Sequence, residues 1–122
     1  LNGSCINKYD EIIYEDLFEV LKIKKGLVSN IIKNSFIGCN LAFNKELLDY
    51  ALPFPKDIPM HDSWLSTIAY IFGKVEFINK KVFYYRLHAN NFTSRKVKLH
   101  KKILWRFLLI KNLFLRYFFE NK

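Results

Sequence analysis

The sequence predicts an α+β protein that is mostly helical, with a small sheet of one strand and a ribbon, and a long C-terminal helix. Hydrophobic residues make up 51% of the 122 residues and aromatic residues 17%, which indicates a packed core rather than disorder. Several stretches have apolar residues at helical spacing, and a few short apolar runs have the length of strands. The length suffices for one small domain but not for two.

The first part of the chain is expected to contain three helices and one strand. Residues 1–10 are polar and are expected to be irregular. Apolar residues at helical spacing predict a helix over 12–23, which Gly26 ends, and another short helix over 27–32. The run FIGCNLAF at 36–43 is typical of a buried strand with a glycine in it.

A helix over 44–51 is expected to follow that strand and to end before the first of three prolines. These prolines fall within seven residues, so 53–60 is predicted to be a stiff, extended loop. Apolar residues then recur at i, i+3, i+4 and i+7 from Leu65 to Phe72, which predicts a helix that Gly73 ends. Two apolar runs, 75–78 and 82–85, flank a polar turn and predict a β-ribbon.

The last predicted helix, 96–122, combines a basic stripe with a wide apolar face. Its charged and polar side chains fall within an arc of roughly 100–120° on a helical wheel, and apolar side chains occupy most of the rest. Arg106, Lys111 and Arg116 lie inside the apolar run and exclude a transmembrane span. Two interpretations stay open: the apolar face packs on the domain or on a second subunit, or the helix lies on an anionic membrane surface.

The net charge of +9 belongs to the second half of the chain. Residues 1–62 carry 7 Lys and 9 acidic residues, whereas residues 63–122 carry 13 Lys and Arg and 2 acidic residues. This balance permits nucleic-acid binding, although no recognised nucleic-acid motif is present. Cys5 and Cys39 form neither a disulfide framework nor a zinc-type spacing, and we expect two reduced thiols in a cytoplasmic protein without a signal peptide.

The densest polar cluster is MHDSW at 60–64, where the proline-rich loop meets the predicted helix. A carboxylate at Asp62 lies in the first turn, where free N–H groups and the helix dipole favour its ionised form. Asp62 could simply cap the helix, with His61 as a loop residue. Alternatively, Asp62 is a general base that faces an open cleft, with His61 or Trp64 shaping the adjoining pocket.

A second cluster, YYRLHANN at 84–91, ends the predicted ribbon. Arg86 offers a guanidinium fork for phosphate, His88 an imidazole for a metal, and Asn90 and Asn91 two amides for hydroxyl groups. The alternative is an exposed strand end followed by a turn.

A glycine lies in the middle of the predicted strand at 36–43. Gly38, which stands two residues before Asn40, marks either the close approach of a ligand or backbone, or a simple bulge.

Five segments in this order resemble the C-terminal half of a family 2 glycosyltransferase of the bacterial rhamnosyltransferase-like subgroup: FIGCNLAFN (36–44), ALPFP (51–55), IPMHDSWL (58–65), FGKVEFI (72–78) and YRLHANN (85–91). The resemblance implies a GT-A fold, in which a nucleotide-diphosphate-binding half precedes an acceptor-binding half. It assigns 1–95 to the second half and leaves 96–122 as a basic amphipathic helix. The Asp-x-Asp metal motif of the first half does not occur in this sequence.

The resemblance also implies roles for single residues. Asp62 matches the catalytic base of inverting members, and His88 matches a histidine that completes a divalent metal site in some of them. Arg86 would support the donor diphosphate or the loop that carries His88. The metal, Mg or Mn, is expected in the full-length enzyme and not in this part alone.

Four further positions match the acceptor side. Gly38 and Asn40 match the strand beneath the acceptor, and His61 and Trp64 match residues beside the base. Trp64 would suit a sugar face, but core packing explains an aromatic residue here equally well.

The implied function is transfer of a sugar from a nucleotide-sugar donor to a saccharide or lipid-linked saccharide, with inversion. The expected setting is cell-surface polysaccharide synthesis at the inner face of the cytoplasmic membrane. We expect this part alone to be inactive and to associate with itself. The alternatives are a non-catalytic oligomerisation or interaction module and a basic nucleic-acid-binding domain.

Overall fold

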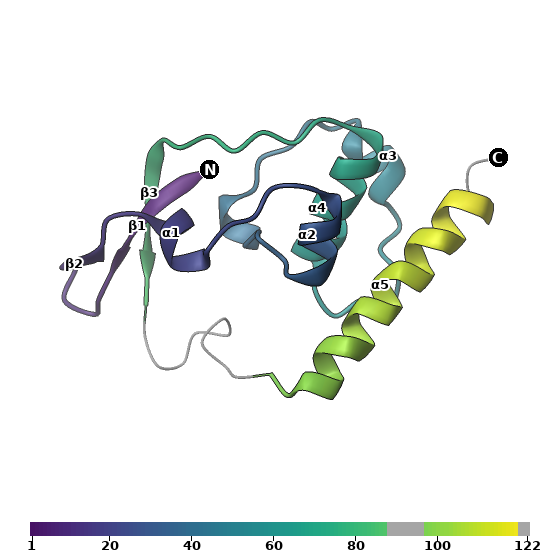
Figure 1. Ribbon diagram of the computed structural model, residues 1–122. Coiled ribbons are helices and arrows are strands. Elements are labelled where there is room, and N and C mark those ends of the chain that lie inside the picture. Colours follow the sequence, from purple (N-terminus) through teal and green to yellow (C-terminus); the bar gives the residue numbers. More distant parts are fainter. Residues whose placement is uncertain (88–96, 120–122) are drawn as a thin grey trace. The chain divides into compact units, whose positions relative to one another are not determined.

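A computed structural model describes residues 1–87 and 97–119 (Figure 1). The protein is α+β, as the sequence predicts. The described residues form two compact units: unit 1 contains 1–24 and 76–87, and unit 2 contains 25–75 and 97–119. The elements, in chain order, are β1 (Asn2–Ile6), β2 (Ile12–Tyr14), α1 (Leu17–Leu21), α2 (Leu27–Ile32), the 3₁₀ helix η1 (Gly38–Asn40), α3 (Leu47–Ala51), α4 (His61–Phe72), β3 (Lys81–Arg86) and α5 (Leu99–Phe119).

Unit 1 is built on a three-stranded sheet of order β2-β1-β3. The central strand, β1, pairs antiparallel with β2 and parallel with β3, and all five of its residues are buried. The expectation of an irregular segment at 1–10 was therefore wrong. Its polar side chains are buried with partners: Asn2 Oδ1 accepts from the backbone N–H of Gly3 (2.8 Å), and the Ser4 hydroxyl donates to Glu15 O (3.0 Å).

The single helix predicted over 12–23 is replaced by β2 and the short helix α1. Asp16 separates the two elements, because its Oδ1 accepts from the backbone N–H groups of Phe18 (2.8 Å) and Glu19 (3.2 Å) and so caps α1. Lys22 ends α1 in the left-handed conformation, with φ of 52°. The apolar residues before Asp16 pair with β1 and do not form one face of a helix.

The pairing predicted for the β-ribbon was also wrong, although its second run, 82–85, does form a strand within β3. β3 pairs with β1 and not with 75–78, which contains no strand. Gly3 permits this pairing, since a Cβ built at Gly3 would lie 2.5 Å from the backbone oxygen of Phe83. The parallel partner of β3 thus lies about 80 residues earlier, at the start of the chain, and a local turn signal cannot indicate it.

Unit 2 is built around α4, which contacts α2 and α3. The predicted helices over 27–32, 44–51 and 65–72 are confirmed by α2, α3 and α4, and the prediction of a long C-terminal helix is confirmed by α5. Residues 53–60 contain no helix or strand, as expected of the proline-rich loop. Among the described residues, no helix is both long and apolar enough to cross a bilayer.

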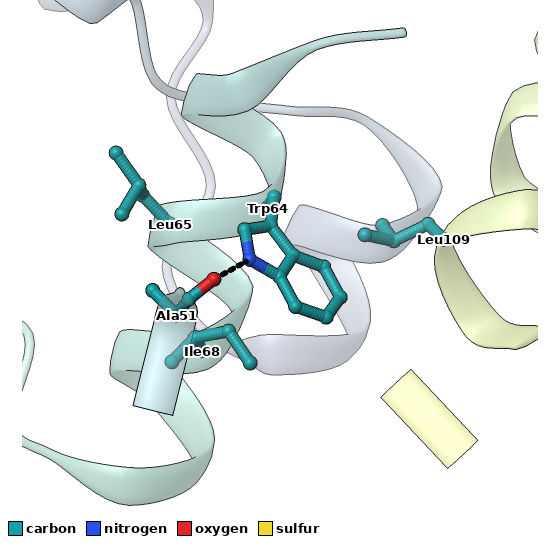
Figure 2. Close-up of a cluster of buried hydrophobic side chains, with 5 residues drawn as sticks. All are labelled: Ala51, Trp64, Leu65, Ile68 and Leu109. Atoms are coloured by element: carbon teal, nitrogen blue, oxygen red, sulfur yellow. Dashed lines mark hydrogen bonds between the residues drawn. The ribbon is translucent and has the colours of Figure 1, made fainter. Parts of the chain in front are cut away.

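The hydrophobic core of unit 2 gathers on one side of α4. Trp64 is fully buried, and its indole Nε1 donates to the backbone oxygen of Ala51 at 2.9 Å (Figure 2). Leu65 and Ile68 of α4 and Leu109 of α5 complete the buried cluster. Because α3 and α5 both meet Trp64 or its neighbours here, this cluster fixes the position of α4 within unit 2.

The buried strand predicted over 36–43 is absent: these residues form η1 and extended segments beside it. Asn40 explains the difference, because its Oδ1 accepts from the backbone N–H of Ile37 (3.2 Å) while its own N–H donates to Ile37 O (3.0 Å). Both hydrogen bonds close a tight turn in the segment where we expected a strand.

We predict that Trp64→Phe lowers the free energy of unfolding by about 2 kcal/mol or more, because it leaves the buried Ala51 carbonyl without its donor and opens a small cavity. Urea titration followed by far-ultraviolet circular dichroism measures the effect. Trp105→Phe, at a half-buried position on α5, is the matched control and should cost less than about 1 kcal/mol. Equal effects of the two variants would contradict a central role of Trp64.

Candidate functional site

Asp62 lies in the first turn of α4, one residue after the helix begins at His61. Met60 occupies the cap position, so the interpretation of Asp62 as the N-cap was wrong. The carboxylate still serves the helix terminus, because its Oδ1 accepts from the backbone N–H of Ser63 at 2.7 Å. Only 8% of Asp62 is exposed, so this residue is buried among the described residues and does not face the open cleft that we expected.

Burial raises the pKa of the Asp62 carboxyl above its ordinary value. Three neighbours oppose this shift by favouring the charged form: the Ser63 backbone N–H, the charge of His61 and the side chain of Asn34. Desolvation outweighs them, and the net direction is upward. A carboxylate with a raised pKa is a stronger base than an ordinary one, which is the property that general-base catalysis needs.

The segments that contain Gly38 and His61 meet at this helix terminus. A Cβ built at Gly38 would lie 2.9 Å from Nε2 of His61, so the glycine allows the imidazole to approach the η1 backbone. The thiol of Cys39 senses the charge of Asp62, and burial and this charge both raise the pKa of the thiol. Asn40 is 3% exposed, and its side-chain oxygen is used by the turn.

A buried polar network positions this terminus from the side of α2. Asn30 is fully buried, and its Nδ2 donates to Ser66 Oγ (2.9 Å) and Thr67 Oγ1 (3.1 Å). The Thr67 hydroxyl donates to the backbone oxygen of Ser63 at 2.7 Å, and Asn30 Oδ1 accepts from the N–H of Ser35 (3.3 Å). The network holds the first turns of α4 against the segment that leads to η1.

Sequence reasoning missed these positioning residues and Asn34. A signal existed: Ser63, Ser66 and Thr67 recur at helical spacing and form a small polar stripe on a helix whose other side is apolar. Such a stripe normally faces solvent, and only the buried Asn30 explains why it does not.

A small hollow lies beside Ser63, the residue that follows Asp62. Its volume of about 10 Å³ leaves room for roughly one water molecule, too little for a sugar ring. Ser63 lines it, and its buried hydroxyl has no hydrogen-bond partner among the described residues. The other lining residues are Ile58, Pro59, Met60, Trp105, Arg106 and Leu109.

Trp64 is a correction to the predicted site. The ring is fully buried in the core and has no face open to a sugar, so we assign it to packing. Arg86 lies in unit 1 at the end of β3, where its guanidinium donates to Asn7 O (2.7 Å) and forms an ion pair with Asp10. Its expected role in supporting a diphosphate stays a prediction.

His88, Asn90 and Asn91 lie outside the described residues, and their expected roles stay predictions. Within residues 1–87 and 97–119, no group of three or more His, Cys, Asp or Glu side chains could hold a metal ion. Of the ligands that the resemblance assigns to the divalent metal, His88 lies outside the described residues and the Asp-x-Asp motif does not occur in this sequence, so the metal stays a prediction. The proposed chemistry does not depend on it.

Comparisons with known proteins do not add to this picture: no family model fits the sequence, and neither a curated protein nor a solved structure matches it significantly. The interpretation of the site therefore depends on its residues and on the ordered motifs in the sequence.

We predict that Asp62→Asn stabilises the protein at neutral pH. The raised pKa means that ionised Asp62 opposes folding, and the asparagine keeps the acceptor for the Ser63 N–H without the buried charge. This gain in stability should vanish as the pH falls below 3.8, the ordinary pKa of the carboxyl, because the carboxyl is then protonated in both the folded and the unfolded protein. Urea titrations over a pH series measure it.

Asp57→Asn is the control, and its expected effect on stability at neutral pH is opposite to that of Asp62→Asn. Lys111 and Asn112 donate to the Asp57 carboxylate and lower its pKa, so Asp57 stabilises the protein above pH 3.8 and loses this contribution as the pH falls. Asp57→Asn should therefore destabilise at neutral pH. Destabilisation by Asp62→Asn at neutral pH would contradict the assignment of Asp62 as a carboxylate that opposes folding.

Proposed function

We propose that this chain is the acceptor-side part of an inverting glycosyltransferase and that Asp62 is its general base. The observation that supports this most is the carboxylate itself: Asp62 lies in the first turn of α4, where burial raises its pKa. A purely structural helix-terminal carboxylate is expected to have the opposite shift, because the helix dipole and the N–H donors favour the charged form.

The surroundings of Asp62 also support the proposal. Two of the five glycosyltransferase-like segments, 36–44 and 58–65, meet where Gly38 contacts His61. This contact lies at the N-terminus of the helix that carries Asp62. In the proposed enzyme, His61 borders the acceptor, and Gly38 is small because the imidazole occupies the space that a Cβ would need.

The proposed chemistry is a single displacement. Asp62 takes the proton of an acceptor hydroxyl while that oxygen attacks the anomeric carbon of the donor sugar. The new carbon–oxygen bond forms on the face opposite the departing nucleotide diphosphate, and the old bond breaks with its electron pair on the diphosphate. The configuration at the anomeric carbon is therefore inverted. In-line geometry is essential for such a step, so the base must be held rigidly, as a buried helix terminus does.

The donor-binding part is proposed to lie in sequence that precedes these motifs in the whole enzyme, together with the carboxylates that hold Mg or Mn. This chain contributes the acceptor site, the base and, through His88, one proposed metal ligand. The isolated chain of 122 residues is therefore expected to be inactive.

We predict that Asp62→Asn in the full-length protein lowers sugar transfer by about 10²-fold or more, the usual contribution of a general base. Membranes of a host that expresses the protein are incubated with a panel of radiolabelled nucleotide sugars, and label in the lipid-linked and polysaccharide fractions is counted. Asp49→Asn, an exposed carboxylate on α3, is the matched control and should keep full transfer.

Two results would overturn the proposal. One is undiminished transfer by a folded Asp62→Asn protein, which would remove the base. The other is transfer by the isolated 122-residue chain, which would show that no separate donor part is needed.

A further inference from the structure

α5 presents its most apolar face to solvent, the reverse of an ordinary surface helix. At 100° per residue, the most exposed apolar side chains share one face about 100° wide. Their exposed fractions range from 52% to 72%, and they are Leu99, Ile103, Phe107, Ile110, Phe114, Tyr117 and Phe118. We call these seven residues the outer face of α5.

The opposite side of α5 is attached to unit 2 largely through polar groups. Asn112 donates to Asp57 (2.8 Å), and Arg106 Nε donates to the backbone oxygen of Ile32 (3.1 Å). Arg116 is 8% exposed, and its guanidinium donates to the two backbone oxygens at 52 and 53. With Leu109 in the core, these bonds orient the helix, so the outer face cannot turn inward without breaking them.

Aromatic rings are concentrated toward the C-terminal end of the outer face. The rings of Phe114 and Phe118 have centroids 4.4 Å apart, and Tyr117 meets Phe118 edge-on at 5.1 Å. An exposed cluster of this kind exceeds the scattered apolar residues of a monomer surface and marks an interaction site.

The charge of α5 identifies the occupant. Residues 99–119 contain five Lys and Arg and no Asp or Glu. On the helical wheel, Lys102 lies beyond one edge of the outer face, and Lys111, which also pairs with Asp57, lies at the other edge. Arg106 borders the first edge too, but its guanidinium Nε donates to Ile32 O. In an interfacial helix, basic side chains at both edges of an apolar face reach anionic headgroups while the face enters the acyl boundary.

A second copy of the chain fits this surface less well. Two outer faces packed together would bring the basic edges of both helices close to each other, and α5 supplies no acidic side chain to offset the repulsion.

We propose that the outer face of α5 docks on an anionic phospholipid bilayer, with the helix axis parallel to the membrane plane. Phe114, Tyr117 and Phe118 insert among the acyl chains, and the lysines contact the headgroups. This inference is independent of the transferase proposal, because it concerns a different surface and a readout that involves no sugar.

The test is flotation of the full chain with vesicles. We predict binding to phosphatidylcholine vesicles that contain about one third phosphatidylglycerol, at least tenfold weaker binding to pure phosphatidylcholine, and weakening by salt. Equal binding to both vesicle types, or binding to neither, overturns the proposal. So does a salt-independent dimer in sedimentation that Phe107→Ser abolishes, since the outer face then belongs to a second copy.

Two pairs of variants locate the binding surface. The triple variant Phe107→Ser, Phe114→Ser, Phe118→Ser should lose at least tenfold in binding, because it removes buried apolar area at the bilayer. The matched control replaces three exposed apolar residues elsewhere in unit 2 and should bind as the parent does: Val28→Ser, Ile32→Ser and Phe43→Ser.

The second pair addresses charge. Lys102→Gln, at an edge of the outer face, should weaken binding about fivefold, whereas Lys45→Gln, which removes the same charge outside α5, should change it little. Both side chains are exposed, so folding is expected to survive, and circular dichroism confirms it. Equal losses in the two members of either pair overturn the assignment to α5.

Discussion

The burial of α4 from Asp62 to Ile68 is the constraint on which unit 2 depends. On one side, the Trp64 indole fills the core and donates to Ala51, which ties α4 to α3. On another side, Asn30 satisfies the hydroxyls of Ser66 and Thr67 and ties α4 to α2. A helix held by both apolar packing and a buried polar network has one orientation. Rotating it would expose the indole and leave the hydroxyl groups without hydrogen-bond partners.

The packing of α4 buries the carboxylate of Asp62, and the ionised form of this carboxylate opposes folding. Asp62 stands at the start of the buried helix with 8% exposure, and desolvation acts on it more strongly than its hydrogen bond to Ser63. A protein selected for stability alone would favour a neutral side chain here. A carboxylate that persists against this cost is expected where chemistry requires it, and this reasoning connects the packing of α4 to the transferase proposal.

The sequence predicted the parts of the fold that local patterns determine. α4 was predicted because its apolar residues follow helical spacing between a proline-rich loop and Gly73. β1 was missed because it is short and partly polar, and its partner β3 lies about 80 residues away, beyond any local signal. The strand expected at 36–43 was wrong because an apolar run does not fix a conformation, and the Asn40 side chain closes a turn instead.

In the candidate site, too, local patterns predicted some features, and others depend on residues far apart in the sequence. The position of Asp62 at a helix terminus and its nearness to His61 followed from the sequence. Its burial did not, since burial depends on tertiary packing that no local pattern records. A helical wheel likewise gave the two faces of α5 without telling which one turns inward. Asp57 and the backbone oxygens that receive Arg116 decide this by accepting polar groups from the helix.

The most direct test of the account is the pKa of Asp62 itself. Carbon-13 NMR of the side-chain carboxyl carbons, with Asp62→Asn used to assign the signal, gives the titration midpoint while the amide spectrum reports that the chain is folded. The account predicts a midpoint above 3.8 for Asp62 and, in the same spectra, below 3.8 for Asp57. A midpoint for Asp62 at or below 3.8 in the folded protein would contradict it.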